Sequence, residues 1–323
     1  MGMVYWSQGD GERAAEYCLQ ATAIGEPLAY KPILARAAIT MGNVLAARHS
    51  TGEAVTWYLR AGALAQEIDD RQALSRAAAN VARILARRGD YARASAGYEH
   101  SLAVAWEIGD RWACCQNVAG LAAVNERLGE LGIAESLYRK AISFGLRLGI
   151  PGYLAGMFVG LARLLLACDR AADARDACGE ALEAIANVSV ERLAGEDTRF
   201  DARVLGIRLR HALGERSNAE TAAELRSLLP GAAPHQQAAL NFELWRLAPG
   251  DAAACAAAAA FYRSAYAEAG EQLYRTRYRA LAGETPPDPP VLPDVSALIP
   301  VSPDHLDLAA ILAGLEESFD RTL

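Results

Sequence analysis

Lysine is almost absent from this chain, and the balance of charge is acidic. Of 323 residues only Lys31 and Lys140 are lysines, and 39 Asp and Glu residues outnumber the 32 basic ones, which gives a net charge of −7. A surface that binds nucleic acid needs clustered basic side chains that neutralise phosphates. The composition therefore argues against binding of DNA or RNA by this chain.

Long apolar runs and paired cysteines are also lacking. No stretch approaches the roughly 20 apolar residues of a membrane-spanning helix, and no export signal stands at the N-terminus. The six cysteines include no Cys-x-x-Cys pair, and a large helical protein needs no disulfide framework. We expect a cytoplasmic protein that does not enter the membrane and whose cysteines are reduced core thiols.

The sequence has none of the common catalytic or metal-binding motifs. It lacks a phosphate loop, a dinucleotide-binding glycine motif, a serine nucleophile elbow and a His-Glu-x-x-His motif. Cys114 and Cys115 stand side by side. Adjacent helical residues point about 100° apart, so we expect one thiol to pack and the other to be partly exposed. We predict no catalytic residue, no metal and no cofactor, with a redox or metal role of this pair as an alternative.

Residues that favour helix are abundant, and they recur at a fixed period. Alanine runs such as residues 251–262 and the scarcity of β-branched residues predict an all-α protein. A unit of 40 residues starts at Gly9, His49, Gly89, Gly129 and Asp169. Five, nine and twelve residues after each start stand an alanine, a tyrosine or cysteine, and an alanine or serine. These offsets differ by four and three, so they form one stripe of a helix that faces a partner helix.

A small residue also recurs in the segment before each start. It stands seven residues earlier, as Gly2, Gly42, Ala82, Ala122 or Ala162. Small residues at this place let two helices approach closely, with the aromatic side chain filling the gap beside them. The start residue marks the turn between the helices, where we expect Gly89 to adopt a positive φ and Asp90 to cap the next helix. Each unit is therefore predicted as helix, turn, helix.

The order of small residue, turn residue, alanine, aromatic and alanine resembles the tetratricopeptide repeat family. The period of 40 is longer than the family's usual period of about 34, and is similar to that of the repeat arrays of bacterial regulators of the maltose-activator type. The resemblance covers residues 1–189 as five repeats. It implies a right-handed superhelical array of antiparallel helix pairs, an α-solenoid.

The register loosens after residue 189. Residues 190–284 are predicted to form drifted repeats and capping helices, because the terminal repeats of a stack are atypical. Residues 285–305 are rich in proline and are predicted to be an extended, semi-rigid linker. Residues 306–323 regain a helical period, and this amphipathic helix either folds back on the array or leads into a further domain. Both ends of the chain suggest a segment of a longer polypeptide.

The concave surface of such an array is lined mainly by the first helix of each pair. By resemblance to the family, its ligand-facing columns carry eight candidate binding residues: Arg36, Asn43, Arg76, Arg83, Arg87, Gln116, Arg127 and Arg163. Arginines in a groove could clamp carboxylates or phosphates. In peptide-binding members of the family an Asn with Lys and Arg grips a C-terminal carboxylate; Asn43 and Arg83 match part of that set, and its lysines are missing. The alternative is that these arginines pair with acidic side chains of neighbouring repeats or are solvated.

The resemblance implies a non-catalytic module that binds a protein or peptide of acidic character. It would be the regulatory or sensor segment of a larger bacterial signalling or transcription-control protein with a fused output domain. A free-standing scaffold that assembles protein complexes is the second hypothesis. An enzyme that uses a helix-lined cavity is the third.

Overall fold

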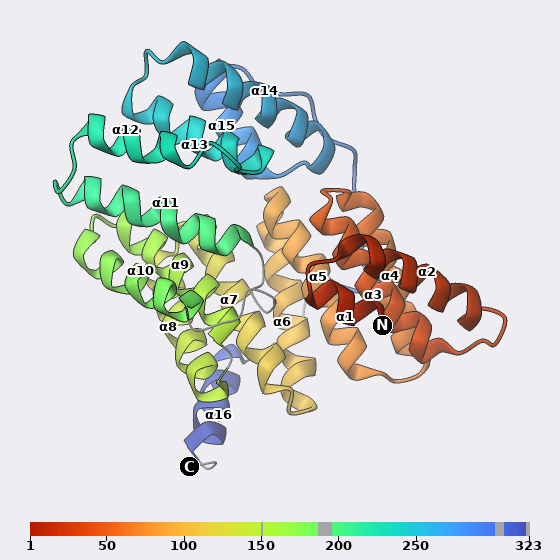
Figure 1. Cartoon of the computed structure of the whole chain (residues 1–323). Helices are drawn as coiled ribbons and strands as arrows, with labels where there is room; N and C mark the ends of the chain where they lie inside the picture. Colours follow the sequence, from red (N-terminus) through yellow and green to blue (C-terminus); the bar gives the residue numbers. More distant parts are fainter. Residues whose placement is uncertain (150, 187–195, 301–306, 321–323) are drawn as a thin grey trace. The chain divides into compact units, whose positions relative to one another are not determined.

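The computed structural model describes all residues except 150, 187–195, 301–306 and 321–323, and every regular element within the described residues is a helix (Figure 1). The prediction of an all-α array of helix pairs is thus confirmed. The chain divides into two compact units: unit 1 comprises Met1–Ile150 and Val291–Leu323, and unit 2 comprises Pro151–Pro290. The division falls inside the five predicted repeats rather than at residue 189.

Unit 1 consists of helices that pack against their neighbours in the sequence. Their bounds are α1 Gly2–Ser7, α2 Gly11–Gly25, α3 Lys31–Ala47, α4 Thr51–Glu67, α5 Arg71–Arg88, α6 Tyr91–Glu107, α7 Arg111–Leu128, α8 Leu131–Leu148 and α16 Leu308–Asp320. From α1 to α8, odd-numbered helices are the first and even-numbered helices the second of each predicted pair. Figure 1 shows these helices stacked side by side.

The repeated columns form the contacts between paired helices. The alanine that stands five residues after each repeat start is fully buried in all five repeats, at Ala14, Ala54, Ala94, Ala134 and Ala174. The ring of Tyr58 on α4 packs directly on Gly42 of α3, where a Cβ atom would lie 2.5 Å from ring atom Cε1. The small residue and the aromatic are therefore complementary, as the repeat predicts.

The residues at the start of each repeat adopt the backbone conformation that the sequence predicts for a turn. Gly89 ends α5 with φ at 86°, and the side chain of Asp90 accepts a hydrogen bond from the amide of Arg93 at the start of α6. His49 holds the same place in the preceding repeat with φ at 62°, a left-handed conformation that few residues other than glycine adopt. The start of each repeat is thus a structural turn.

Odd-numbered helices also pack on one another. Contacts join α1 to α3, α3 to α5 and α5 to α7, whereas no equally close pair of even-numbered repeat helices occurs among the described residues of unit 1. In a curved stack, helices that touch across successive pairs lie on the shorter, inner side. We call the surface of α3, α5 and α7 the inner face, and that of α4, α6 and α8 the outer face.

The chain returns to the outer face of unit 1 after residue 291. Val295, Leu298 and Ile299 are buried, although the segment was predicted to be a linker. Leu298 fills the space above Gly62 of α4, and Ile299 fills the space above Gly97 of α6. The apolar residues between the prolines therefore anchor this segment to the repeats.

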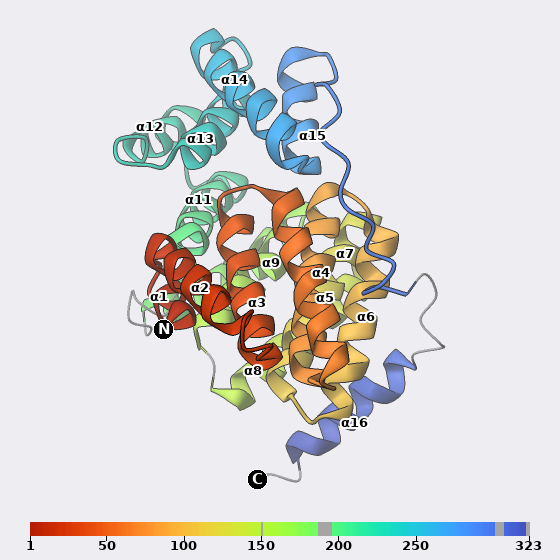
Figure 2. The ribbon, with the colours of Figure 1, turned by 90° about the vertical axis from the view of Figure 1, so that its right-hand side faces the viewer.

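Helix α16 continues on the outer face, against α6 and α8 (Figure 2). The ring of Phe319 stacks on that of Phe144 with centroids 5.4 Å apart, and the guanidinium of Arg111 lies 5.1 Å from the Phe319 centroid. Lys140 forms an ion pair with Glu316. The structure therefore shows that this helix folds back on the array, away from the inner face.

Unit 2 contains the remaining helices: α9 Pro151–Ala167, α10 Ala171–Ala186, α11 Glu196–Ala212, α12 Asn218–Ser227, α13 Pro234–Leu247, α14 Ala252–Ala269 and α15 Gln272–Ala282. Again α11 packs on both α9 and α13, which places the odd-numbered helices together. Tyrosines form much of the core between α13, α14 and α15, where the rings of Tyr262 and Tyr274 stack at 5.8 Å. Aromatic packing thus replaces the small-residue contacts of the earlier repeats.

Candidate ligand-binding face

Seven of the eight predicted binding residues lie on the helices of the inner face. They are Arg36 and Asn43 on α3, Arg76, Arg83 and Arg87 on α5, and Gln116 and Arg127 on α7. Spacings of seven and four residues along each helix keep them on one stripe, and steps of 40 bring each stripe into register with the next. The eighth residue, Arg163, lies on α9 in unit 2.

A hydrogen-bonded network fixes the centre of this face. The hydroxyl of Tyr58 donates to Oδ1 of Asn43 at 2.7 Å, and the amide nitrogen of Asn80 donates to the same oxygen at 3.2 Å. Both bonds use the Asn43 oxygen. Its amide nitrogen has no partner among the described residues and remains a donor for a ligand.

The charges of the α5 arginines act on two buried tyrosines. Burial raises the pKa of Tyr58 to about 12, against the opposing charge of Arg83. Burial also raises the pKa of Tyr98 to about 12, against the opposing charges of Arg83 and Arg87. Both hydroxyls stay protonated at neutral pH, so Tyr58 acts as the donor in its bond to Asn43.

The inner arginines differ from those of the outer face in their partners. Within the described residues, no carboxylate lies at ion-pair distance from Arg36, Arg76, Arg83 or Arg127. Arg76 also has a buried Nε with no hydrogen-bond partner. These four side chains therefore do not pair with acids of neighbouring repeats.

Outer basic side chains, in contrast, have carboxylate partners. Arg60 on α4 pairs with Glu26 at 2.5 Å, and Arg139 on α8 pairs with Glu135 at 2.8 Å. The unpaired donors of the inner face thus suit an anionic ligand, because an arginine presents a fork of N–H groups that matches a carboxylate or phosphate.

Sequence reasoning missed three residues of this face. Tyr58 and Tyr98 were assigned to packing alone, although the hydroxyl of the first positions Asn43. Asn80 was not considered, because the equivalent positions of the neighbouring repeats hold Thr40 and Gly120. No polar residue therefore recurs regularly at this position. A polar side chain three residues before Arg83 is the signal that could have revealed it, since this spacing shares a helix face.

The prediction for the adjacent cysteines was partly wrong. Cys114 and Cys115 are both buried, at 1% and 0% exposure, because α7 is packed against α5, α6 and α8 at once. Burial raises the pKa of each thiol to about 12. A protonated, inaccessible thiol is a poor nucleophile. The part of the chain that the structure describes also holds no cluster of His, Cys, Asp or Glu that could bind a metal.

One further finding concerns membranes: among the described helices, none combines the length and the apolar character needed to cross a bilayer.

No family model matches the chain, and the comparison with curated proteins finds no match. Among solved structures, the chain is similar to BtubC (BKLC) from P. vanneervenii, with a TM-score of 0.52 and 19% sequence identity. The similarity covers 72% of this chain and 94% of that chain. At this identity the likeness concerns the fold alone, and it agrees with the helical architecture described above.

Proposed function

We propose that the chain is a non-catalytic binding module of tetratricopeptide type, which holds an acidic protein segment or peptide on the inner face of unit 1. It would act in the cytoplasm as the regulatory or sensor part of a larger bacterial signalling or transcription-control protein. The observation that carries the proposal is the set of inner arginines without carboxylate partners.

The chemistry of the face favours a carboxylate-rich ligand. Arg76, Arg83 and the amide nitrogen of Asn43 are all donors, and Tyr58 holds Asn43 in place before any ligand binds. Donors fixed in advance lose little conformational entropy on binding. An extended acidic segment could meet successive donors along the face.

The test uses the full chain and a fluorescein-labelled acidic peptide with several Glu residues and a free C-terminal carboxylate. Fluorescence anisotropy would give the Kd. We expect Arg76→Gln and Arg83→Gln each to weaken binding about tenfold, as loss of one hydrogen bond to a charged group implies. The matched control is Arg60→Gln, which removes the same charge from an outer arginine that pairs with Glu26.

Two outcomes would overturn the proposal. The first is absence of binding by the unaltered chain; the second is equal weakening by Arg60→Gln, which would indicate general attraction between charges. A peptide with an amidated C-terminus separates recognition of the terminal carboxylate from recognition of the Glu side chains.

A further inference from the structure

A cavity lies in unit 2, between the first two turns of α11, the connection from α12 to α13, and the first turn of α13. Its volume is about 210 Å³, and it is partly open to solvent. The residues that line it were not among the predicted binding residues. The cavity shares no residue with the inner face of unit 1, so what it binds does not depend on the function proposed for that face.

One wall of the cavity is a tight turn between α12 and α13. The amide of Ala232 donates to the carbonyl of Leu229 at 3.2 Å, which closes a four-residue turn. Pro230 and Gly231 occupy its two central positions, and Gly231 has φ at 83°. Proline followed by a glycine with positive φ is typical of a type II turn. The shape of this wall is therefore fixed by the local sequence before a ligand arrives.

The apolar lining of the cavity is the open edge of a packed core. Phe200, Leu228 and Ala232 line the cavity, and the same three residues pack against a buried cluster that includes Val204 and Leu225. A cavity of about 150 Å³ is large enough for benzene, whereas sites for drug-sized ligands span about 300 Å³ or more. The volume of this cavity therefore fits a single ring with one small substituent.

Two arginines without partners complete the lining. Arg199 and Arg203 are four residues apart, which places them on one side of α11. Among the residues that the structure describes, neither guanidinium has an ion pair, a hydrogen-bond acceptor or an aromatic ring as partner. Two later arginines of the same helix do have carboxylate partners, at 3.6 Å for Arg208 and 2.6 Å for Arg210. The cavity thus presents two guanidinium forks with unused N–H donors.

The described acidic residues of α11 lie on a different stripe of the helix. Asp197 accepts hydrogen bonds from His235 at 2.6 Å and from Gln236 at 3.1 Å, so α13 holds its carboxylate. Asp201 follows Asp197 by four residues and shares its stripe. Because Gln236 lines the cavity, the charge of Asp197 still lies near one side of it. That charge disfavours a dianion and leaves the cavity better suited to a monoanion.

We propose that this cavity binds a small organic monoanion, a carboxylate on a single apolar ring, such as an aromatic carboxylate. The carboxylate would accept hydrogen bonds from Arg199 and Arg203, whose planar forks match its two oxygens. The ring would pack on Phe200 and Leu228, next to the turn at Pro230. Charge and shape are then both required for binding.

The experiment titrates the full chain with benzoate by isothermal calorimetry. We expect saturable binding, and we expect Arg199→Gln and Arg203→Gln each to weaken it about tenfold. Two further probes separate the parts of the ligand. Benzamide keeps the ring without the charge, acetate keeps the charge without the ring, and each should bind at least about tenfold more weakly than benzoate.

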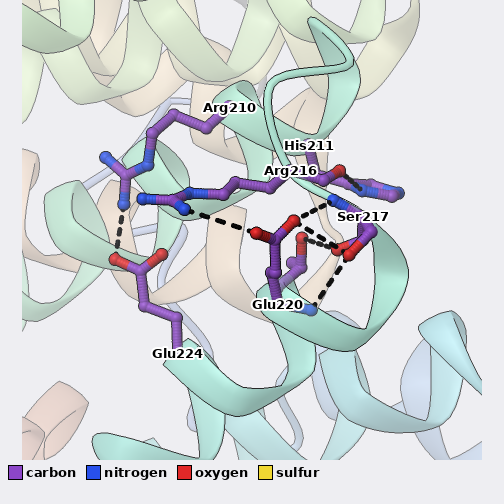
Figure 3. A network of polar contacts seen from close by, with 7 residues as sticks. Arg210, His211, Arg216, Ser217, Glu220 and Glu224 are labelled. Atoms are coloured by element: carbon purple, nitrogen blue, oxygen red, sulfur yellow. Dashed lines mark hydrogen bonds and ion pairs between the residues drawn. The ribbon is translucent and has the colours of Figure 1, made fainter.

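Arg210→Gln is the matched control. Arg210 lies on the same helix but does not line the cavity, and its side chain pairs with Glu224 of α12 at 2.6 Å. Figure 3 shows this pair beside the capping box of Ser217 and Glu220. Removal of this arginine takes away the same charge without touching the proposed site, so the Kd for benzoate should stay unchanged.

Four results would overturn the proposal: no binding of benzoate by the unaltered chain, equal weakening by Arg210→Gln, binding of benzamide as tight as that of benzoate, or tighter binding of phenyl phosphate, which would indicate a site for a dianion. If Arg199→Gln does not fold, the exposed Arg203 carries the test alone, because its replacement breaks no bond among the described residues. Arg203→Gln should leave the acidic peptide's Kd unchanged, so failure here is distinguishable from failure of the site in unit 1.

Discussion

The inner and outer faces of unit 1 are built from the same 40-residue repeat. They differ in whether their charged and apolar side chains have partners within the chain. On the outer face, Lys140 pairs with Glu316 and the ring of Phe319 covers that of Phe144. On the inner face, Arg76 has a buried nitrogen with no partner. The outer face is therefore satisfied by the chain itself, while the inner face keeps donors available for another molecule.

The largest effect on stability should come from a change that detaches α16 from the outer face. Leu315 of α16 is fully buried, so Leu315→Asp places a charge among apolar groups at a cost on the order of 4 kcal/mol. We expect α16 to detach while the repeats stay folded. Hydrogen exchange followed by mass spectrometry should show lost protection at 308–320 alone.

The control for this change lies on the exposed side of the same helix. Ala313→Asp adds the same charge at an exposed position and should leave α16 protected. Retained protection in Leu315→Asp would mean that the outer contacts are not what holds the helix.

The next effect concerns the tyrosines beneath the inner face. The pKa values of Tyr58 and Tyr98 rise from 10.0 to about 12 in the folded chain. Their contribution to stability is complete below pH 10 and is lost as the pH rises toward 12, because the unfolded chain gives up these protons first. At pH 11 the loss is about 1.4 kcal/mol for each tyrosine.

Urea unfolding at pH 9 and pH 11 would measure this loss. In the double variant Tyr58→Phe and Tyr98→Phe, the fall in free energy of unfolding between the two pH values should be smaller by about 3 kcal/mol. An unchanged fall would show that these hydroxyls do not carry the alkaline sensitivity.

A smaller effect tests the close packing between the faces. Gly42→Ala places a Cβ atom 2.5 Å from the ring of Tyr58, so the ring must move and carry its bond to Asn43 with it. We expect a loss of about 2 kcal/mol in the free energy of unfolding, measured by urea titration.

The same substitution should act in the opposite direction where space is open. Gly156 lies in the middle of α9, is exposed, and has nothing within 4 Å of an added Cβ atom. Gly156→Ala should stabilise the chain by about 0.5–1 kcal/mol through helix propensity. A stabilising Gly42→Ala would contradict the packing described for Tyr58.

The smallest effect contrasts single charges on the two faces. Arg139→Gln breaks an exposed pair with Glu135 on α8 and should cost about 0.3–0.5 kcal/mol. Arg36→Gln and Arg127→Gln break no ion pair and should leave the free energy of unfolding unchanged. A loss from either inner substitution as large as that from Arg139→Gln would reveal a partner on the inner face.

Much of the fold was predictable because the same packing contacts between paired helices recur in every repeat. Buried alanines, the tyrosine column and the left-handed turn at Gly89 follow from local rules for helices and their ends. The inner stripe of Asn43 and Arg83 was also found, since its register follows from the same period. The register of the helices after residue 189 was not found, because the 40-residue period fails there.

The sequence by itself determined the helix pairs, their turns and the candidate residues of one face, since these depend on residues within 40 positions of one another. Only the tertiary structure decided the burial of both Cys114 and Cys115, the return of residues 295–299 and of α16 to the outer face, and which arginines lack a carboxylate. These features join residues far apart in the chain. Contacts of that kind follow from the packing of whole helices, and no repeated pattern in the sequence marks them.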